Sequence, residues 1–502
     1  MKKRENFKIN SIARYLSIAI TLIFTPFFYT NLYAEEKLAP SDSLSIQNEF
    51  NCFAIIAGKN ATADGSVLLA HNEDDSGEQM LNIYIVPRKD GLENPAPENA
   101  NSTEKNNGSA KYLWCEFPGM EVADCFLNEY GVSVVSNSCP SKEDRVDFTD
   151  GGVLYEVRTT VAKKARTAKE AVKLLGKLIE KRGYRGSGRT YSIADCNEAW
   201  IFSAVQGRHW VAQRVPDDCV MALPNNYIID QVDLSDTINF SGSPDLIEYA
   251  IARGWYNPQQ DGPFSFKKAY CKPSTYISDR NVWRHQSALQ YLTGKNYNPH
   301  PDSFELFVKP NRKITLEDMI EVLASHGENL QQTREIDREN KGKKKHPECI
   351  CVSRTVVSTI FQLRSNKPKE SASIMWVAAG RPCVEPFIPW YIGIENSNSS
   401  EIKSFGRFAT AEEAEQKHFT DSKNMRQNYP HAATWRFVQR WEWLEEDYEK
   451  RLPALTKERD NFQKQIFRQH SKFDAEAVPE RMEKYTAGYY KEYFKKMEKY
   501  TK

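Results

Sequence analysis

The spacing of apolar and polar positions along the chain predicts where strands and helices lie. From Cys52 onward, short apolar runs are bounded by turn residues, which is typical of β-strands. The runs "CFAIIAG" and "SVLLAHNED" flank the turn at Asp64–Gly65 and predict a β-hairpin. Further strands are predicted at 81–88, 131–138, 190–216 (with a turn at 195–197), 219–229, 355–365 and 371–380.

Between these strand groups the apolar period changes to that of a helix. The segment 167–183 begins with a capping box, Thr167 and Glu170, and ends at Gly183. It carries apolar residues along one face: Val172, Leu175, Leu178 and Ile179. A second helix is predicted at 315–328. Strand groups that alternate with helix groups predict an α+β domain with sheets inside and helices outside.

The last hundred residues have a different, helical pattern. A capped helix is predicted to start at Thr410, and four apolar residues fall at helical spacing: Phe437, Trp441, Leu444 and Tyr448. We therefore expect a main domain over 52–400 and a helical region over 401–502 that packs on it. The polar segment 89–111 has a composition that cannot form a core, and it is expected to be a surface loop.

The N-terminal segment 1–34 reads as a secretory signal peptide. A basic start, "MKKRENFK", precedes the apolar stretch "YLSIAITLIFTPFFY" and then Ala34, a small residue before a plausible cut. The alternative is an uncleaved membrane anchor, but the stretch falls short of the ~20 residues needed to span a bilayer and contains Pro26. We expect export across the cytoplasmic membrane, to a periplasm or the outside, with no stable membrane association after signal removal. Residues 35–51 would then form a short propeptide.

Composition limits the classes of function. The 502 residues carry a formal net charge of +1 and are 40% hydrophobic. This is ample for a large core and gives no electrostatic case for binding nucleic acid. The composition is also compatible with a homo-oligomer. No cofactor is expected.

The ten cysteines are scattered through the chain. If Cys52 is reserved for chemistry, nine remain, and nine cannot all pair, so some thiols stay free. The segment "HPECIC" (His346, Cys349 and Cys351) resembles a metal cluster but lacks a matching second pair. A strand entering the core is the preferred reading, and no metal is predicted.

Cys52 is the candidate nucleophile. A cysteine nucleophile needs a base, and none of the nine histidines stands in a recognisable cysteine-protease context. Cleavage between Asn51 and Cys52 would supply one, because the new α-amine titrates near 7.7–8.0 and is well matched to a thiol near 8.5. One residue would then provide both nucleophile and base.

The segment 52–77 resembles the start of the mature chain in the cysteine dipeptidases of the N-terminal nucleophile (Ntn) hydrolases. Those proteins share a Cys, a short strand, Gly-Lys-x-Ala-Thr-x-Asp-Gly-Ser, a second strand and an Arg/His-Asn-Glu/Asp-Asp motif. The likeness continues through "FLNEYGVSVVSNS", "TYSIADCNEAWIF", "PNNYII" and "IMWVAAGRPCVEPFIPWYIG", and covers roughly residues 52–395. Secernins, penicillin V acylases and bile salt hydrolases would be more distant relatives. The resemblance implies a four-layered αββα sandwich, here with additional C-terminal helices.

The resemblance also implies roles for individual residues. Cys52 matches the nucleophile, and Asp74 matches the acidic residue that holds the nucleophile and its amine. His71 stands where penicillin V acylases and bile salt hydrolases have Arg, which puts the charge support of the thiolate in doubt. Asn225 matches an oxyanion-hole amide, and Asn137 is a looser match to a second donor that could slip to Ser138. The late active-site arginine would be Arg280 or Arg284.

Each of these residues also has a purely structural interpretation. Free Cys is often a small core residue, Asp74 could cap a turn, and Asn225 could be an ordinary amide at a strand end. Taken together, the residues favour an exported cysteine dipeptidase that acts on dipeptides or short peptides. The alternatives are an amidase or acyltransferase for a non-peptide amide, and a catalytically silent, secernin-like binding protein.

Overall fold

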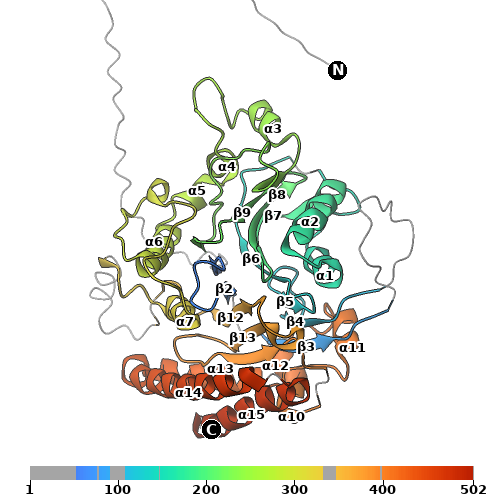
Figure 1. Cartoon of the computed structure of the whole chain (residues 1–502), viewed down its shortest axis with the longest axis vertical. Coiled ribbons are helices and arrows are strands. Elements are labelled where there is room, and N and C mark those ends of the chain that lie inside the picture. Colours follow the sequence, from blue (N-terminus) through green and yellow to red (C-terminus); the bar gives the residue numbers. More distant parts are fainter. Residues whose placement is uncertain are drawn as a thin grey trace, which may run out of the picture. The chain divides into compact units, whose positions relative to one another are not determined.

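The computed structural model describes residues 52–75, 79–90, 108–145, 147–331, 346, 348–395, 398–476 and 478–500. These residues belong to one compact unit, in which the C-terminal helices lie along one side (Figure 1). The predicted signal peptide, the propeptide and most of the polar loop lie outside the described residues.

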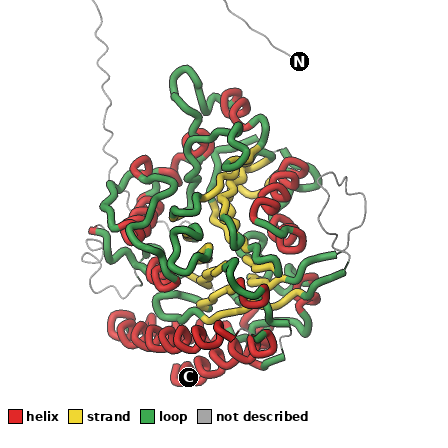
Figure 2. Tube along the Cα trace, viewed as in Figure 1, coloured by secondary structure: helices red, strands yellow, loops and turns green. Residues whose placement is uncertain are grey.

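Two antiparallel sheets form the centre of the domain (Figure 2). The six-stranded sheet has the order β10 (Val220–Leu223), β1 (Phe53–Ala57), β2 (Val67–Asp74), β12 (Thr355–Leu363), β13 (Ser373–Ala378), β14 (Ile388–Tyr391). The eight-stranded sheet has the order β11 (Phe240–Gly242), β9 (Trp210–Val215), β8 (Ala199–Gly207), β7 (Tyr184–Ala194), β6 (Ser133–Ser138), β5 (Cys125–Asn128), β4 (Tyr112–Glu116), β3 (Asn82–Val86).

Helices cover the outer face of each sheet. α1 (Tyr155–Lys164) and α2 (Ala168–Arg182) pack on the eight-stranded sheet, while α6 (Asp279–Thr293), α7 (Leu316–Ala324) and α15 (Pro479–Met497) pack on the six-stranded one. The remaining helices are α3 (Leu246–Ala252), α4 (Phe266–Tyr270), α5 (Pro273–Tyr276), α9 (Lys369–Ala372), α10 (Ser400–Lys403), α11 (Ala411–Gln416), α12 (Met425–Asn428), α13 (Thr434–Glu446) and α14 (Tyr448–Glu476), with 3₁₀ turns at Pro301–Ser303 and Glu498–Tyr500. The predicted αββα sandwich with additional C-terminal helices is confirmed.

The local signals in the sequence explain the elements nearest the centre. β1 and β2 form the predicted hairpin, with Phe53 paired to Asn72, and every residue of both strands is buried. α2 starts as predicted, because the Thr167 side chain accepts a hydrogen bond from the Glu170 amide. It ends at Gly183, whose φ of 83° favours glycine.

Four sequence predictions need correction. α7 stops at Ala324, because Ser325 turns to extended backbone. His346 and residues 348–351 precede β12 without strand structure, and of these residues His346, Cys349, Ile350 and Cys351 are buried. β10 ends at Leu223, because Pro224 lacks the N–H that a ladder needs. The four apolar residues predicted at helical spacing near the C-terminus lie on two helices, because α13 ends at Glu446 and Tyr448 begins α14.

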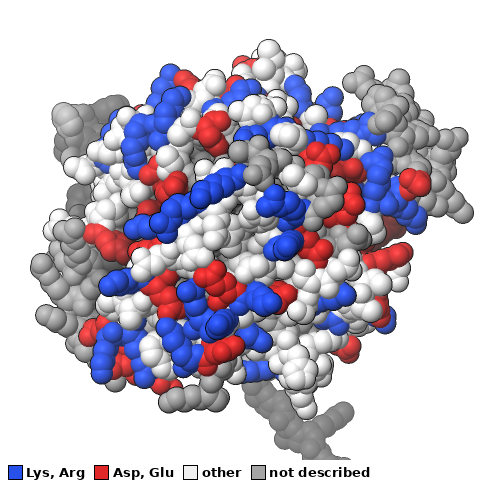
Figure 3. Space-filling view, turned by 60° about the horizontal axis from the view of Figure 1, so that its bottom comes forward, with Lys and Arg blue, Asp and Glu red and all other residues white. Residues whose placement is uncertain are grey.

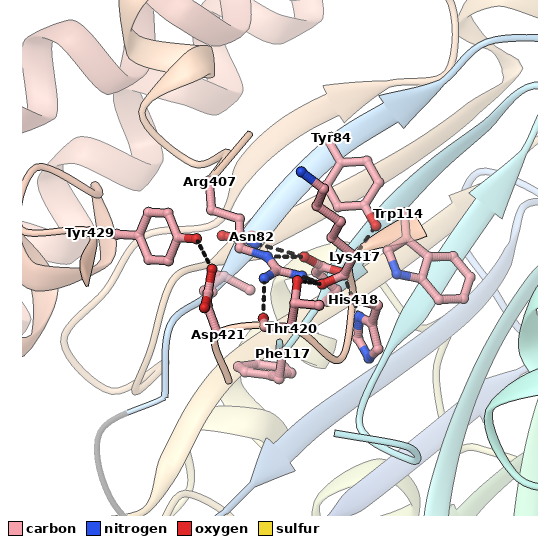
Figure 4. A network of polar contacts seen from close by, with 12 residues as sticks. Asn82, Tyr84, Trp114, Phe117, Arg407, Lys417, His418, Thr420, Asp421 and Tyr429 are labelled. Atoms are coloured by element: carbon pink, nitrogen blue, oxygen red, sulfur yellow. Dashed lines mark hydrogen bonds and ion pairs between the residues drawn. The ribbon is translucent and has the colours of Figure 1, made fainter. Parts of the chain in front are cut away.

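A buried polar network fastens the C-terminal region to the eight-stranded sheet. The Arg407 guanidinium lies 3.4 Å from Glu116 of β4 and donates to the carbonyls of Thr420 and Lys417, each at 2.7 Å. The ring of His418 approaches the same carboxylate, with Nδ1 at 2.6 Å, so Arg407 and His418 converge (Figure 4). Buried charges that are paired and hydrogen-bonded resist separation, so this region is an integral part of the domain.

Basic and acidic side chains are interspersed over the face on which the C-terminal helices lie, and neither sign dominates it (Figure 3). This agrees with the near-neutral net charge of the chain. Among the described residues, no helix is both long enough and apolar enough to span a membrane.

Candidate active site

Cys52 immediately precedes β1, which is the second strand from one edge of the six-stranded sheet. β1 runs between β10 and β2, and its register with β2 places Cys52 opposite Glu73. The thiol is fully buried, and its Sγ donates to Glu73 Oε1 at 3.1 Å. The backbone N–H of Asp74 also bonds to the sulfur. Strand pairing thus fixes the thiol between two consecutive acidic residues.

Burial and these carboxylates set the protonation of the site. Burial raises the pKa of the Cys52 thiol well above its usual value, and the charges of Glu73 and Asp74 raise it further. Burial likewise raises the pKa of Asp74 to about 7. A hydrogen bond from the Thr355 hydroxyl, at 2.6 Å, lowers this pKa and offsets only part of the effect of burial. With a peptide bond on its N-terminal side, Cys52 is therefore held as a neutral thiol.

Two arginines, one from the eight-stranded sheet and one from the helix that packs on it, supply positive charge at the site. Burial first, and then the charge of Arg158, lower the pKa of His71 to about 3, so its ring is neutral at physiological pH. Arg189 of β7 is buried, donates to Ser136 Oγ at 3.0 Å and lowers the pKa of Cys52. Arg158 of α1 bonds the same hydroxyl. Arg189 of the eight-stranded sheet and Arg158 of α1 thus supply the positive charge that the neutral His71 ring does not.

Two amides and an arginine surround the Cys52 backbone and the loop after β10. Asn137 Nδ2 donates to Cys52 O at 2.9 Å and to Leu223 O at 3.0 Å, which uses both of its hydrogens. Asn225 Nδ2 donates to Ser138 O at 2.9 Å, and its Oδ1 accepts from Arg284 at 3.0 Å. Asn137 thus holds the backbone of Cys52 in place, and Asn225 keeps a second amide hydrogen that can bind another group.

Of the two candidate arginines, the structure brings Arg284 to Cys52. Arg284 is buried, and its guanidinium donates to Cys52 O at 3.1 Å and to Asn281 Oδ1 at 2.6 Å. Arg280 lies one helical turn earlier and is half-buried, and its carbonyl accepts from Arg284 Nε at 3.2 Å. Of the two arginines that the sequence left open, Arg284 is therefore the one that contacts Cys52.

Glu73, Arg189 and Asn281 also belong to this site, although the sequence did not single them out. Glu73 could have been found, because the hairpin register places the third residue of "HNED" opposite Cys52. The other two come from segments far away in sequence and carry no local signal.

The site does not offer a good place for a metal cation. One side-chain atom each of Cys52, His71 and Glu73 lie within 4.8 Å of one another. The nearby guanidinium groups of Arg158 and Arg189 repel a cation at this position, because their positive charges act on both His71 and Glu73.

A buried cysteine that faces carboxylates, amides and arginines defines the class as a cysteine hydrolase. The model of peptidase family C69 matches residues 141–442, more than half of the chain, and the chain belongs to this family. The protein is a hydrolase that acts on peptide bonds, of the cysteine type. The matched region contains Asn225 and Arg284 and begins after Cys52.

Curated relatives extend the similarity over most of the chain. A probable dipeptidase of Latilactobacillus sakei is 27% identical over 70% of this chain and 76% of its own length. A probable dipeptidase B of Streptococcus pyogenes is 26% identical over 70% and 74%. A probable dipeptidase of Salmonella dublin is 25% identical over 72% and 85%.

Two solved structures share a distant likeness. Penicillin V acylase from Agrobacterium tumefaciens is 14% identical, with a TM-score of 0.33 over 68% of this chain and 87% of that one. A variant of the conjugated bile acid hydrolase from Clostridium perfringens is 12% identical, with a TM-score of 0.34 over 69% and 94%. Both likenesses are too weak to support a conclusion about this chain.

Replacing Asn225 by alanine is expected to lower kcat by roughly 10²–10³, the usual loss for one preorganised oxyanion donor, with little change in Tm. The matched control is Asn226→Ala, because Asn226 is equally buried but donates to Tyr227 O at 3.0 Å. We expect this control to lose less than tenfold in kcat. A larger loss in the control than in Asn225→Ala would move the oxyanion role to Asn226.

Proposed function

We propose that this peptidase hydrolyses dipeptides or other short peptides and that its nucleophile is the thiol of an N-terminal Cys52, exposed by processing. The proposal includes export of the chain under the direction of residues 1–34. The observation that carries it is the position of Cys52, which immediately precedes strand β1 and whose buried thiol donates to Glu73 at 3.1 Å. The names of the curated relatives agree with a dipeptide substrate.

A free amine at Cys52 would complete the chemistry that the site lacks. His71 lies in the same buried cluster, and burial, together with the charges of Arg158 and Arg189, keeps its pKa low. Asp74 Oδ2 is buried and has no hydrogen-bond partner among the described residues, so it can accept a hydrogen bond from an α-ammonium group. The ammonium charge would lower the thiol pKa that burial and the carboxylates raise.

The reaction then proceeds through an acyl-enzyme. The Cys52 amine takes the thiol proton, and Sγ attacks the carbonyl carbon of the substrate. Asn225 donates to the oxyanion, and the ammonium returns its proton to the leaving amine as the C–N bond breaks. Water, deprotonated by the same amine, hydrolyses the thioester and releases the acid.

A small cavity of about 20 Å³, which has room for about one water molecule, lies beside the amides. It adjoins Asn226 and Asn281, the second of which hydrogen-bonds Arg284, and so lies next to the site. Its walls are mainly apolar and come from the segment around α5 and α6: Tyr276, Val282, Phe304 and Leu306.

A substrate panel tests the proposal. The protein that starts at Cys52 is expected to cleave free dipeptides faster than the same dipeptides with an acetylated amine, and faster than an N-acyl amide without a peptide bond. Product amino acids are measured by amine derivatisation and chromatography, with heat-denatured protein as the blank. Turnover of the acyl amide alone would establish the amidase alternative. Binding without turnover of any member would establish the secernin-like one.

A further inference from the structure

Four metal-ligating side chains meet at a place separate from the active site. His326 follows α7, His346 and Cys351 lie in the loop before β12, and Cys383 lies between β13 and β14. All four are buried, and one ligand atom from each lies within 4.8 Å of all the others. Three segments that are distant in sequence thus bring two imidazoles and two thiols to one point.

The distances in this cluster fit a tetrahedral ion. His346 Nε2 lies 3.7 Å from Cys351 Sγ and 3.5 Å from Cys383 Sγ. A tetrahedral Zn²⁺ with Zn–S near 2.3 Å and Zn–N near 2.0–2.1 Å requires nitrogen and sulfur ligands to be about 3.6 Å apart. A small inward movement would place all four ligands in that geometry.

The orientation of the His326 ring also fits a tetrahedral metal ion. Its Nδ1 lies 3.4 Å from Glu328 Oε1, which favours a proton on that nitrogen. The other nitrogen, Nε2, is buried and has no hydrogen-bond partner among the described residues. A carboxylate behind a histidine whose second nitrogen faces thiols is the arrangement that supports a metal-bound imidazole.

We propose that His326, His346, Cys351 and Cys383 bind one structural Zn²⁺. Two thiolates and two imidazoles in a compact, buried set are the ligands that zinc prefers, whereas Mg²⁺ and Ca²⁺ require oxygen. The chain supplies all four ligands, so the ion has no open position for substrate and acts by holding segments together.

The ion would brace the back of the active site. The loop that holds Cys351 continues to Thr355, whose hydroxyl donates to Asp74 at 2.6 Å. The segment that holds Cys383 is bound by the C-terminal helix α14, since Arg459 of that helix donates to Pro382 O at 2.7 Å. Zinc would therefore join three segments: the residues after α7, the loop before β12, and the segment between β13 and β14, which α14 covers.

The expectation of no metal at "HPECIC" depended on the lack of a second ligand pair in the sequence nearby. Cys349 takes no part, because it is buried next to Arg284 instead. The second pair, His326 and Cys383, comes from remote segments. A cleft between α7 and α14 reaches both residues and gives the ion a route of entry.

Metal content tests the proposal and does not depend on the peptidase function. The full chain, expressed with zinc and purified without chelators, is expected to hold about one zinc per chain by elemental mass spectrometry. Cys351→Ser and Cys383→Ser should each reduce the zinc content at least tenfold. The matched control is Cys349→Ser, a buried thiol two positions from Cys351, which should keep its zinc.

A second measurement applies even if the ligand variants fail to fold. Wild-type protein exchanged into Co²⁺ should show the visible absorption of tetrahedral cobalt and a thiolate-to-cobalt charge-transfer band. Its Tm should fall on zinc removal and recover with Zn²⁺ but not Mg²⁺. Wild-type protein with neither zinc nor a cobalt spectrum, a Cys351–Cys383 disulfide in peptide maps, or equal zinc loss in Cys349→Ser would overturn the proposal.

Discussion

Replacing Cys52 by alanine is expected to abolish the hydrolysis of dipeptides while the protein stays folded. The substitution removes the thiol that bonds to both the Glu73 carboxylate and the Asp74 amide. One small buried substitution costs at most a few kcal/mol of stability, so the loss should lie in kcat and not in Tm. Activity is measured as amino-acid release from several dipeptides, and folding by circular dichroism and thermal unfolding.

Two further variants make this result specific. Cys52→Ser should keep little activity, because a hydroxyl is a weaker nucleophile at the basicity of this amine. Cys125→Ala removes another thiol that is buried between the sheets and free, and should keep full activity. Full activity of Cys52→Ala would rule out the proposed mechanism.

The unprocessed chain is expected to be inactive until the bond between Asn51 and Cys52 is cut. Before the cut, the Cys52 nitrogen is an amide and cannot act as a base. Burial and the charges of Glu73 and Asp74 also raise the thiol pKa, which leaves too little thiolate at neutral pH. Cleavage removes both obstacles, because it creates an amine and places a positive charge beside the carboxylates.

We propose that the chain makes this cut itself. Cys52 Sγ attacks the Asn51 carbonyl, the amide C–N bond breaks with its nitrogen taking the thiol proton, and water hydrolyses the resulting thioester. Asn137 and Arg284, which both bind the Cys52 carbonyl, hold the residue in place. Trimming of residues 35–51 by another protease is the competing route.

Intact-mass analysis of wild type and Cys52→Ala, both expressed with residues 35–51 in a protease-free system, separates the two routes. Self-cleavage predicts a wild-type chain that starts at Cys52 and a variant that keeps Asn51. A wild type that retains the segment and is cut only on addition of host extract supports external trimming. A wild type that retains the segment and is fully active would show that the N-terminal-nucleophile hypothesis is wrong.

Local signals were sufficient for the elements that carry the nucleophile. The hairpin of β1 and β2 follows from two apolar runs and one Asp-Gly turn, and its register alone places Glu73 opposite Cys52. The limits of α2 follow from the Thr167 cap and Gly183. These features depend on residues a few positions apart, so the sequence contains all the information that they need.

The partners that give the cysteine its environment could not be found in this way. Arg189, Arg284 and Asn137 reach Cys52 only because two sheets pack face to face and α6 crosses the end of β10. The same holds for the proposed zinc ligands, of which only His346 and Cys351 are close in sequence. Side chains and their neighbours along the chain determine strands, turns and caps, whereas charge, donor geometry and metal ligation depend on contacts between remote segments, which only the packing of the layers creates.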